Sequence, residues 1–157
     1  MSSTSQYLTL GLDRETFGIP IEHVYEILDV RPISALPQAP DFLVGMIDVR
    51  GRSYPVVDLR TKLGLPRVDP TPATRIILLN LPVNGREMGV GFVADRVFEV
   101  TALDGGALES APEVGGRWRS TYIAGIGRKG EAFVVVFDLA RLMATDDQAD
   151  FMTTLAA

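Results

Sequence analysis

Residues 42–63 read FLVGMIDVRGRSYPVVDLRTKL, and residues 122–143 read YIAGIGRKGEAFVVVFDLARLM, so one pattern returns at a constant offset of 80. Phe42-Leu43-Val44-Gly45 lies over Tyr122-Ile123-Ala124-Gly125, and Val56-Val57-Asp58-Leu59 lies over Val136-Phe137-Asp138-Leu139. Apolar, glycine and aspartate positions that recur at a fixed spacing indicate an internal repeat. The chain is expected to contain two related halves.

The repeat continues upstream with small insertions. Gly18-Ile19 matches Gly89-Val90 at an offset of 71, and Val24-Tyr25-Glu26-Ile27 matches Val97-Phe98-Glu99-Val100 at an offset of 73. A unit of about 70 to 80 residues is too long for a solenoid repeat and suits a small barrel of about five short strands. Closing each sheet would remove exposed edges. We predict an all-β fold of two tandem barrels.

Local signals predict where strands turn and where short helices begin. Arg50-Gly51-Arg52 and Asn84-Gly85 predict hairpin turns. Asp58 and Asp138 are expected to cap short helices at 59–63 and 139–144, a role that we prefer to that of paired catalytic carboxylates.

Three further segments are assigned from spacing and composition. Ile21, Val24, Tyr25 and Leu28 follow Pro20 with helical spacing, which predicts one or two helical turns. The proline-bearing segment 67–74 is the expected linker, and 101–121 is expected to be a long connection.

The composition excludes several classes of function. The 157 residues include no cysteine and one histidine, His23, and they carry a formal net charge of −5. These features exclude disulfide scaffolds, thiolate metal sites and sites with two imidazoles. An acidic chain is not expected to bind nucleic acid, and no P-loop or Gly-x-Ser-x-Gly elbow is present. We expect no enzymatic activity, no metal and no cofactor.

The sequence shows neither a membrane span nor a targeting segment. No apolar run approaches the roughly 20 residues that cross a bilayer. The polar start, Met1 to Gln6, lacks the basic and apolar parts of a secretory signal. We expect a cytoplasmic protein without direct membrane insertion.

Arg50 is the strongest candidate for a functional side chain. The first copy has Asp48-Val49-Arg50-Gly51 in its hairpin, where the second has Arg128-Lys129-Gly130-Glu131. A feature that only one copy carries is a better candidate for function than the shared scaffold. Two interpretations stay open: Arg50 pairs with a carboxylate such as Glu26, or its guanidinium anchors a partner. Val24 is expected to be half-buried nearby.

With these residues in place, the chain resembles the CheW family, the coupling proteins of bacterial chemosensory arrays. The resemblance runs from about Gln6 to Met143. Its motifs are Phe17-Gly18-Ile19, Val24-Tyr25-Glu26-Ile27, Pro40-x-Phe42-x-x-Gly45, Val49-Arg50-Gly51, Pro55-Val56-Val57-Asp58-Leu59-Arg60, Gly89-Val90, Ala94-Asp95-x-Val97, Tyr122-Ile123-Ala124-Gly125-Ile126 and the unit from Val135 to Leu142. Their order and spacing together are specific to the family.

The resemblance implies two SH3-like five-stranded β-barrels with a few short helices. The single CheW-like domain would span residues 6–144, with halves at roughly 14–66 and 75–144. Strand exchange by residues 6–12 is left open, and residues 1–5 and 145–157 would be flexible or helical tails.

The resemblance also implies a non-enzymatic adaptor that couples a chemoreceptor, a methyl-accepting chemotaxis protein, to a CheA-type histidine kinase. The receptor's cytoplasmic tip would lie in a groove between the barrels, while loops and exposed strands contact the kinase's regulatory domain. The candidate receptor- or kinase-binding residues are Val24, Glu26, Gly45, Asp48, Arg50 and Gly51. The protein would be recruited to membrane-associated receptor arrays.

One position departs from the family, and two other functions stay open. Asp48 stands where the family usually has Asn, and its carboxylate is expected to pair with Arg50 or Arg52 or to alter partner choice. The alternatives are an adaptor of a parallel chemosensory pathway, with a second-messenger or gene-expression output, and a small-molecule binding module that uses the cleft between the barrels.

Overall fold

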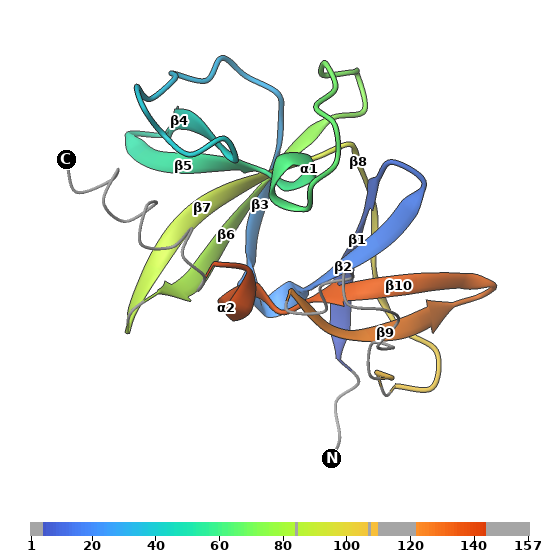
Figure 1. Cartoon of the computed structure of the whole chain (residues 1–157). Helices are drawn as coiled ribbons and strands as arrows, with labels where there is room; N and C mark the ends of the chain where they lie inside the picture. The colour runs from blue at the N-terminus through green and yellow to red at the C-terminus, as the bar shows by residue number, and fades with distance from the viewer. Residues whose placement is uncertain (1–4, 84, 107, 110–121, 144–157) are drawn as a thin grey trace.

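The computed structural model describes residues 5–83, 85–106, 108–109 and 122–143, and these residues form mainly β-structure (Figure 1). The strands are β1 (Gln6–Leu12), β2 (Glu15–Pro20), β3 (Val24–Asp29), β4 (Leu43–Val49), β5 (Arg52–Asp58), β6 (Arg75–Val83), β7 (Arg86–Ala94), β8 (Arg96–Ala102), β9 (Ile123–Lys129) and β10 (Ala132–Phe137). The helical segments are the 3-10 turn η1 (Ile21–His23), α1 (Leu59–Lys62) and α2 (Leu139–Leu142).

The strands pair into two five-stranded sheets. Sheet A has the order β8-β1-β2-β10-β9, and sheet B has the order β3-β6-β7-β5-β4. Within each sheet one pair is parallel, β2 with β10 and β5 with β7, and the other pairs are antiparallel. The predicted all-β fold with two five-stranded units is confirmed.

The two copies of the repeat exchange their first hairpins. β1 and β2 precede β3 to β5 in the sequence, yet they lie in sheet A, while β6 and β7 lie in sheet B. Each strand therefore has its repeat counterpart at the same place in the other sheet: β1 and β6, β2 and β7, β3 and β8, β4 and β9, β5 and β10.

This exchange divides the chain differently from the expected halves at 14–66 and 75–144. Because β1 pairs with β8 and β2 pairs with β10, the whole hairpin 6–20 completes sheet A, not residues 6–12 alone. Sheet B is built from the continuous stretch 24–94, and the rest of sheet A comes from 96–137.

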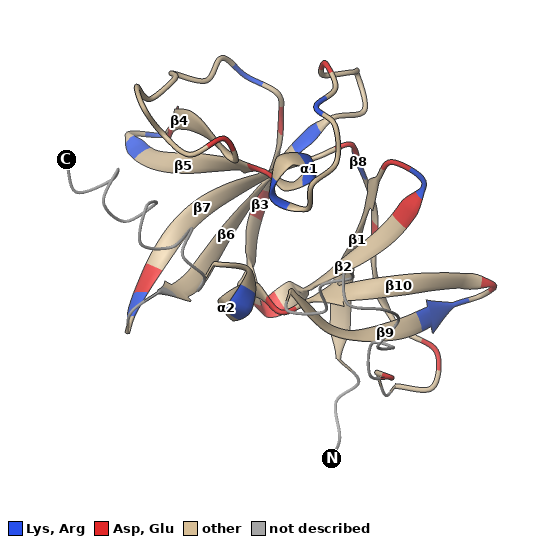
Figure 2. Ribbon diagram, viewed as in Figure 1, with Lys and Arg blue, Asp and Glu red and all other residues tan. Residues whose placement is uncertain are grey.

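The described residues form a hydrophobic core with three parts. One cluster lies between the sheets and includes Leu8 and Leu10 of β1 with Ile77 and Leu79 of β6. A second cluster lies inside the barrel of sheet B, and a smaller one, which includes Val136, lies inside the barrel of sheet A. Charged residues gather at strand ends and connections (Figure 2). Most apolar side chains of the strands are thus buried within their own barrel or against the other one, apart from exposed ones such as Tyr25 on β3 and Phe98 on β8.

The glycine shared by both copies is explained by a close backbone approach. Ser34 bridges to Met46 beside Gly45, where an added Cβ would lie 2.1 Å from the Ser34 carbonyl oxygen. In the second copy Glu109 bridges to Ile126, and a Cβ at Gly125 would lie 2.9 Å from the Glu109 oxygen. A side chain at either position would push the connecting segment off its strand.

The predicted turns and caps are confirmed. The Asp58 carboxylate accepts a hydrogen bond from the Arg60 amide at 3.2 Å, and the Asp138 carboxylate accepts one from the Arg141 amide at 3.0 Å. Hairpins join β4 to β5 and β6 to β7 as expected. Both aspartates start a short helix, which agrees with capping.

The helical stretch predicted after Pro20 is confirmed for one turn only. Only the 3-10 turn η1 forms there, and Val24 begins strand β3, which pairs with β6. The β-branched and aromatic side chains of β3 favour a strand once a partner strand is present. The described residues leave out most of the expected connection 101–121, residue 144, and the tails 1–5 and 145–157 apart from Ser5.

Candidate functional site

Glu26 and Arg50 form a two-point ion pair between β3 and the β4–β5 turn. Arg50 Nη1 donates to Glu26 Oε2 at 3.2 Å, and Arg50 Nη2 donates to Glu26 Oε1. The Arg50 side chain is 63% exposed and that of Glu26 is 30% exposed. The predicted pairing of Arg50 with Glu26 is confirmed, and much of the guanidinium still faces outward.

Asp48 shapes the turn that presents Arg50. Arg50 and Gly51 have φ angles of 51° and 84°, the two consecutive left-handed residues that a tight hairpin of this kind requires. Asp48 Oδ1 accepts a hydrogen bond from the Gly51 amide at 3.0 Å. The expected ion pairs of Asp48 with Arg50 or Arg52 are wrong among the described residues, because its carboxylate bonds to the turn's backbone.

The charges of this corner reinforce one another. The hydrogen bond from Arg50 lowers the pKa of Glu26 below its ordinary value, against the opposing effect of burial, and Arg31 adds to the lowering. The Glu26 carboxylate in turn raises the pKa of Arg50. Both groups therefore stay charged at neutral pH, which keeps the pair intact.

The candidate residues do not all lie at the surface. Glu26, Asp48, Arg50 and Gly51 meet at one place, which we call the Glu26–Arg50 corner. Val24 is half-buried as expected and packs against the core between the sheets, and Gly45 is buried beneath Ser34. Gly45 therefore acts on the corner only through the backbone of β4.

The sequence interpretation missed side chains beside the corner. Tyr25 and Ile27 project from β3 and are 53% and 41% exposed. Arg31 Nη1 donates to the Asp48 carbonyl oxygen at 3.4 Å, while its Nε is shielded from solvent and lacks a hydrogen-bond partner among the described residues. Reading 24–29 as a strand would have shown the outward alternation of Tyr25 and Ile27.

A small groove opens between the two sheets close to η1. It has a volume of about 240 Å³ and is lined by Pro20, His23, Pro82, Ala124 and residues 137–140. Pro82 belongs to sheet B, whereas Pro20, Ala124 and Phe137 belong to sheet A. We call this feature the interbarrel groove, because its walls come from both barrels.

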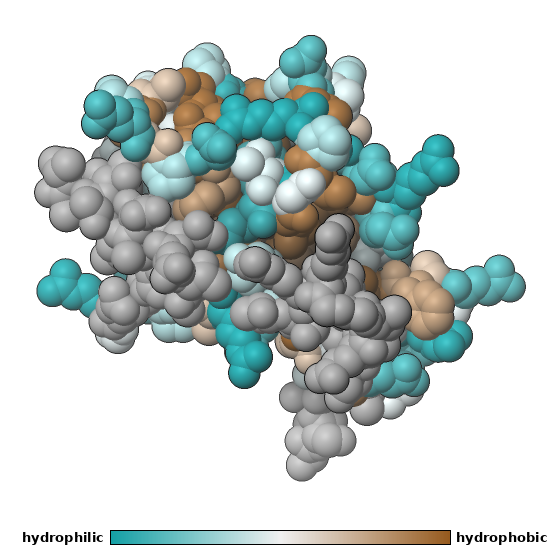
Figure 3. All heavy atoms as spheres, viewed as in Figure 1, coloured by the Kyte–Doolittle hydropathy of each residue, from teal (hydrophilic) through white to brown (hydrophobic). Residues whose placement is uncertain are grey.

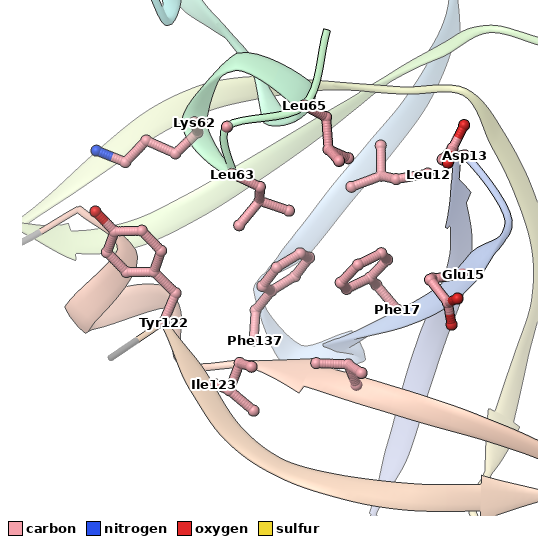
Figure 4. A pocket seen from close by; sticks show the side chains of 12 residues that line it. Leu12, Asp13, Glu15, Phe17, Lys62, Leu63, Leu65, Tyr122, Ile123 and Phe137 are labelled. Carbon is pink, nitrogen blue, oxygen red and sulfur yellow. The ribbon is translucent and has the colours of Figure 1, made fainter. Parts of the chain in front are cut away.

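A larger apolar cleft lies beneath the end of α1, with a volume of about 640 Å³. In its middle the rings of Phe17 and Phe137 stack with centroids 5.0 Å apart (Figure 4). Glu15 lies at one end of the cleft and Lys62 at the other (Figure 4). Figure 3 shows hydrophobic residues near the centre of this face, with hydrophilic residues above them and to their right. Phe137 lines both the cleft and the interbarrel groove.

The described residues show no cluster of three or more His, Cys, Asp or Glu side chains that would hold a metal ion. Across those same residues, the structure has no helix that is both long and apolar enough to span a bilayer.

Comparisons with known proteins agree with this fold. The family model of the CheW-like domain matches residues 6–147. The chemotaxis protein CheW of Klebsiella aerogenes is 31% identical over 144 residues, covering 92% of this chain and 84% of that protein. The chemotaxis protein CheW of Treponema pallidum is 25% identical over 142 residues, covering 90% and 84%.

A solved structure leads to the same fold. The scaffolding protein TtCheW from Thermoanaerobacter tengcongensis superimposes with a TM-score of 0.80 at 25% identity, covering 92% of this chain and 96% of that one. This match confirms the predicted pair of SH3-like barrels. Members of the family are named as chemotaxis and scaffolding proteins, which confirms the prediction of a non-enzymatic role. The chain therefore belongs to the CheW-like domain family and is an adaptor of chemotaxis signalling.

Proposed function

We propose that this protein couples the cytoplasmic tip of a chemoreceptor to the regulatory domain of a CheA-type histidine kinase. The observation that carries the proposal is the Glu26–Arg50 corner. Glu26 fixes the Arg50 guanidinium through two hydrogen bonds, yet the Arg50 side chain is 63% exposed. A charged side chain held in one orientation and open to solvent suits an interface anchor, because less rotamer entropy is lost on binding.

The interbarrel groove supports the receptor half of the proposal. A helix docks in a groove through apolar anchors, and charges within the groove oppose this docking. Pro20, Pro82 and Ala124 give this groove a mostly apolar lining, with His23 and Asp138 among its polar residues. We place the helical receptor tip here, next to η1 and the start of β3.

The exposed strands support the kinase half of the proposal. Tyr25 and Ile27 on β3 have repeat counterparts in Phe98 and Val100 on β8, and all four side chains are at least 41% exposed. β3 and β8 are edge strands of their sheets. Exposed aromatic side chains on an edge strand are typical of contact surfaces. Through these contacts the protein would join membrane-associated receptor arrays from the cytoplasm.

A binding measurement with one charge reversal tests the receptor contact. Calorimetry would measure the affinity of a purified chemoreceptor cytoplasmic fragment for the wild type, for Arg50→Glu and for Arg86→Glu. Arg86 is an exposed arginine at the β6–β7 hairpin of the same sheet, so its reversal matches the charge change. We expect Arg50→Glu to abolish binding and Arg86→Glu to preserve it. Equal binding by both variants would refute the role of the corner.

The apolar cleft favours a second candidate, a small-molecule binding module. Its volume of about 640 Å³ lies in the range of ligand pockets, roughly 300–1,000 Å³. A thermal-shift screen with nucleotides tests this function, since a ligand that binds only the folded state raises the melting temperature. No shift at saturating nucleotide would count against it. Pull-downs with several receptors would distinguish an adaptor of a motility pathway from an adaptor of a parallel chemosensory pathway.

A further inference from the structure

The contact between the two sheets is mainly apolar. Leu8 and Leu10 of sheet A pack with Ile77 and Leu79 of sheet B in one cluster. Hydrophobic association scales with buried area and has little directionality. Such a surface holds the barrels together without directional bonds of its own. Directional bonds at the same interface would add to the selection of one angle.

Arg60 supplies bonds of this kind at the point where the chain passes from sheet B to sheet A. Asp95 lies between β7 of sheet B and β8 of sheet A. Arg60 Nε donates to Asp95 Oδ1 at 2.9 Å and to Oδ2 at 3.1 Å, and Nη2 donates to Oδ2 at 2.7 Å. Arg60 Nη1 donates to the Pro66 carbonyl oxygen at 3.0 Å.

The β1–β2 turn joins the same cluster from sheet A. Asp13 Oδ1 lies 3.4 Å from Arg60 Nη2, and the Asp13 amide donates to Asp95 Oδ2 at 2.7 Å. Arg96 Nη2 donates to the Asp13 carbonyl oxygen at 2.7 Å, and the Asp95 amide donates to the Gly11 carbonyl oxygen at 3.1 Å. Three segments from two sheets therefore converge on one guanidinium and one carboxylate.

The cluster is buried enough for its geometry to be specific. The side chains of Arg60 and Asp95 are 10% and 18% exposed. Burial acts to raise the pKa of Asp95, but the hydrogen bonds from Arg60 hold it below its ordinary value, so the pair stays ionised. A buried ion pair adds little net stability over apolar side chains of the same size, yet its bonds are lost when the partners shift.

Only one copy of the repeat carries this device. Ala140 occupies the position of Arg60 in the second copy, and Leu142 occupies that of Lys62. Lys62 Nζ lies 4.2 Å from the centroid of the Phe42 ring and 5.6 Å from that of Tyr122, two aromatic residues that are themselves repeat counterparts. Helix α1 thus directs two cations at the junction of the barrels, whereas α2 directs none from these positions.

We propose that Arg60 is a positioning residue that sets the angle between the two barrels and, through that angle, the width of the interbarrel groove. Pro82 lines the groove from sheet B, and Ala124 lines it from sheet A, so a rotation of one sheet changes the distance between its walls. The consequence for partner binding rests on the proposed function, whereas the consequence for the angle does not.

The angle can be measured without any partner. The chain has no cysteine, so Glu87→Cys and Glu131→Cys on the exposed hairpins of sheets B and A give two unique spin-label sites. Pulsed electron–electron double resonance then measures the distribution of distances between the two spin labels, one on each barrel. We expect one narrow distribution for the wild type and a broad one for Arg60→Met combined with Asp95→Leu, which replaces the ion pair with apolar side chains and should still fold cooperatively.

Two further variants keep the test decisive. Arg60→Lys retains the charge but loses the fork of donors, so it should fold and also broaden the distribution. Arg141→Met removes an exposed arginine of α2, which is paired with Asp138 at 3.6 Å, and should leave the distribution narrow. A distribution as narrow as the wild type's in folded Arg60→Lys, or in the folded double variant, would overturn the proposal.

Measuring partner binding as well distinguishes a failure of this proposal from a failure of the proposed function. We expect the double variant to bind the chemoreceptor fragment about ten-fold more weakly than wild type. Wild type that fails to bind the fragment while the variants still broaden the distribution would refute the proposed function and leave the role of Arg60 standing. Broadening together with unchanged affinity would overturn the step from angle to groove.

Discussion

Glu26 and Arg50 lie 24 positions apart in the sequence and meet through two hydrogen bonds at the outer corner of sheet B. The pair joins an edge strand to a hairpin turn, with Arg50 held in a left-handed backbone conformation. Glu26 occupies only part of the guanidinium, which has five N–H donors. The corner therefore combines a fixed geometry with free hydrogen-bonding capacity.

Exchanging the two charges separates the role of Arg50 as an anchor for a partner from its role in the ion pair with Glu26. In Glu26→Arg combined with Arg50→Glu the ion pair can re-form, but the exposed donors of Arg50 are gone. We expect the exchanged variant to unfold at nearly the wild-type temperature, since exposed ion pairs contribute little to stability, and to remain unable to bind the receptor fragment. Recovery of binding in the exchanged variant would show that binding depends on the ion pair itself and not on the exposed donors of Arg50.

Gly45→Ala should destabilise the protein through a backbone clash. The new Cβ would lie 2.1 Å from the Ser34 carbonyl oxygen, and no change of rotamer relieves a contact with backbone. We expect a loss of about 3 kcal/mol or more, at the upper end for overpacking, in urea unfolding. Gly64→Ala is the control, because Gly64 also has a positive φ but has open space around it. Equal losses for the two variants would argue against the clash.

Acid should weaken the Arg60–Asp95 pair in a defined direction. A carboxyl whose pKa is lower in the folded state binds fewer protons there than in the unfolded chain. Its stabilising effect is complete above the unfolded pKa, about 4, and is lost as the pH falls through the folded value. The difference in unfolding free energy between wild type and Asp95→Asn should be constant from pH 7 to about pH 5 and shrink below about pH 4. A difference that grows on acidification would show the opposite shift.

Removing the helix caps tests the structural assignment of both repeated aspartates. Asp58 accepts hydrogen bonds from the Arg60 amide and, at 2.9 Å, from the Thr61 hydroxyl, whereas Asp138 accepts one from the Arg141 amide. Alanine at either position should cost about 1 kcal/mol, with the larger loss at Asp58. Thermal unfolding of the two single variants measures this order. No loss at either position would exclude capping.

The repeat made much of this fold predictable, because apolar and glycine positions recur wherever the two barrels have equivalent strands. The exchange of hairpins was not predictable. β1 and β2 carry the same pattern whether they complete their own copy or the other one, and only the pairing of β1 with β8 decides between these arrangements. The segment after Pro20 misled for a related reason, since spacing alone does not reveal the partner strand β6.

The candidate site was predictable where chemistry demanded a partner. A half-buried Glu26 needs a cation, and Arg50 was one that the second copy lacks. The contacts of Asp48 depend on the geometry of a two-residue turn, so the hydrogen bond between its carboxylate and the Gly51 amide could not be predicted from the sequence alone. The Arg60 cluster joins residues 13, 60 and 95, which only the crossing between sheets brings together.

Coupling is measured by the amount of CheA-type kinase that co-sediments with chemoreceptor-containing membranes as this protein is added. We predict that kinase in the pellet rises with added wild-type protein and then saturates, that Arg86→Glu gives the same curve, and that Arg50→Glu gives no rise. Kinase that sediments equally without this protein, or a full rise with Arg50→Glu, would rule out coupling through the Glu26–Arg50 corner.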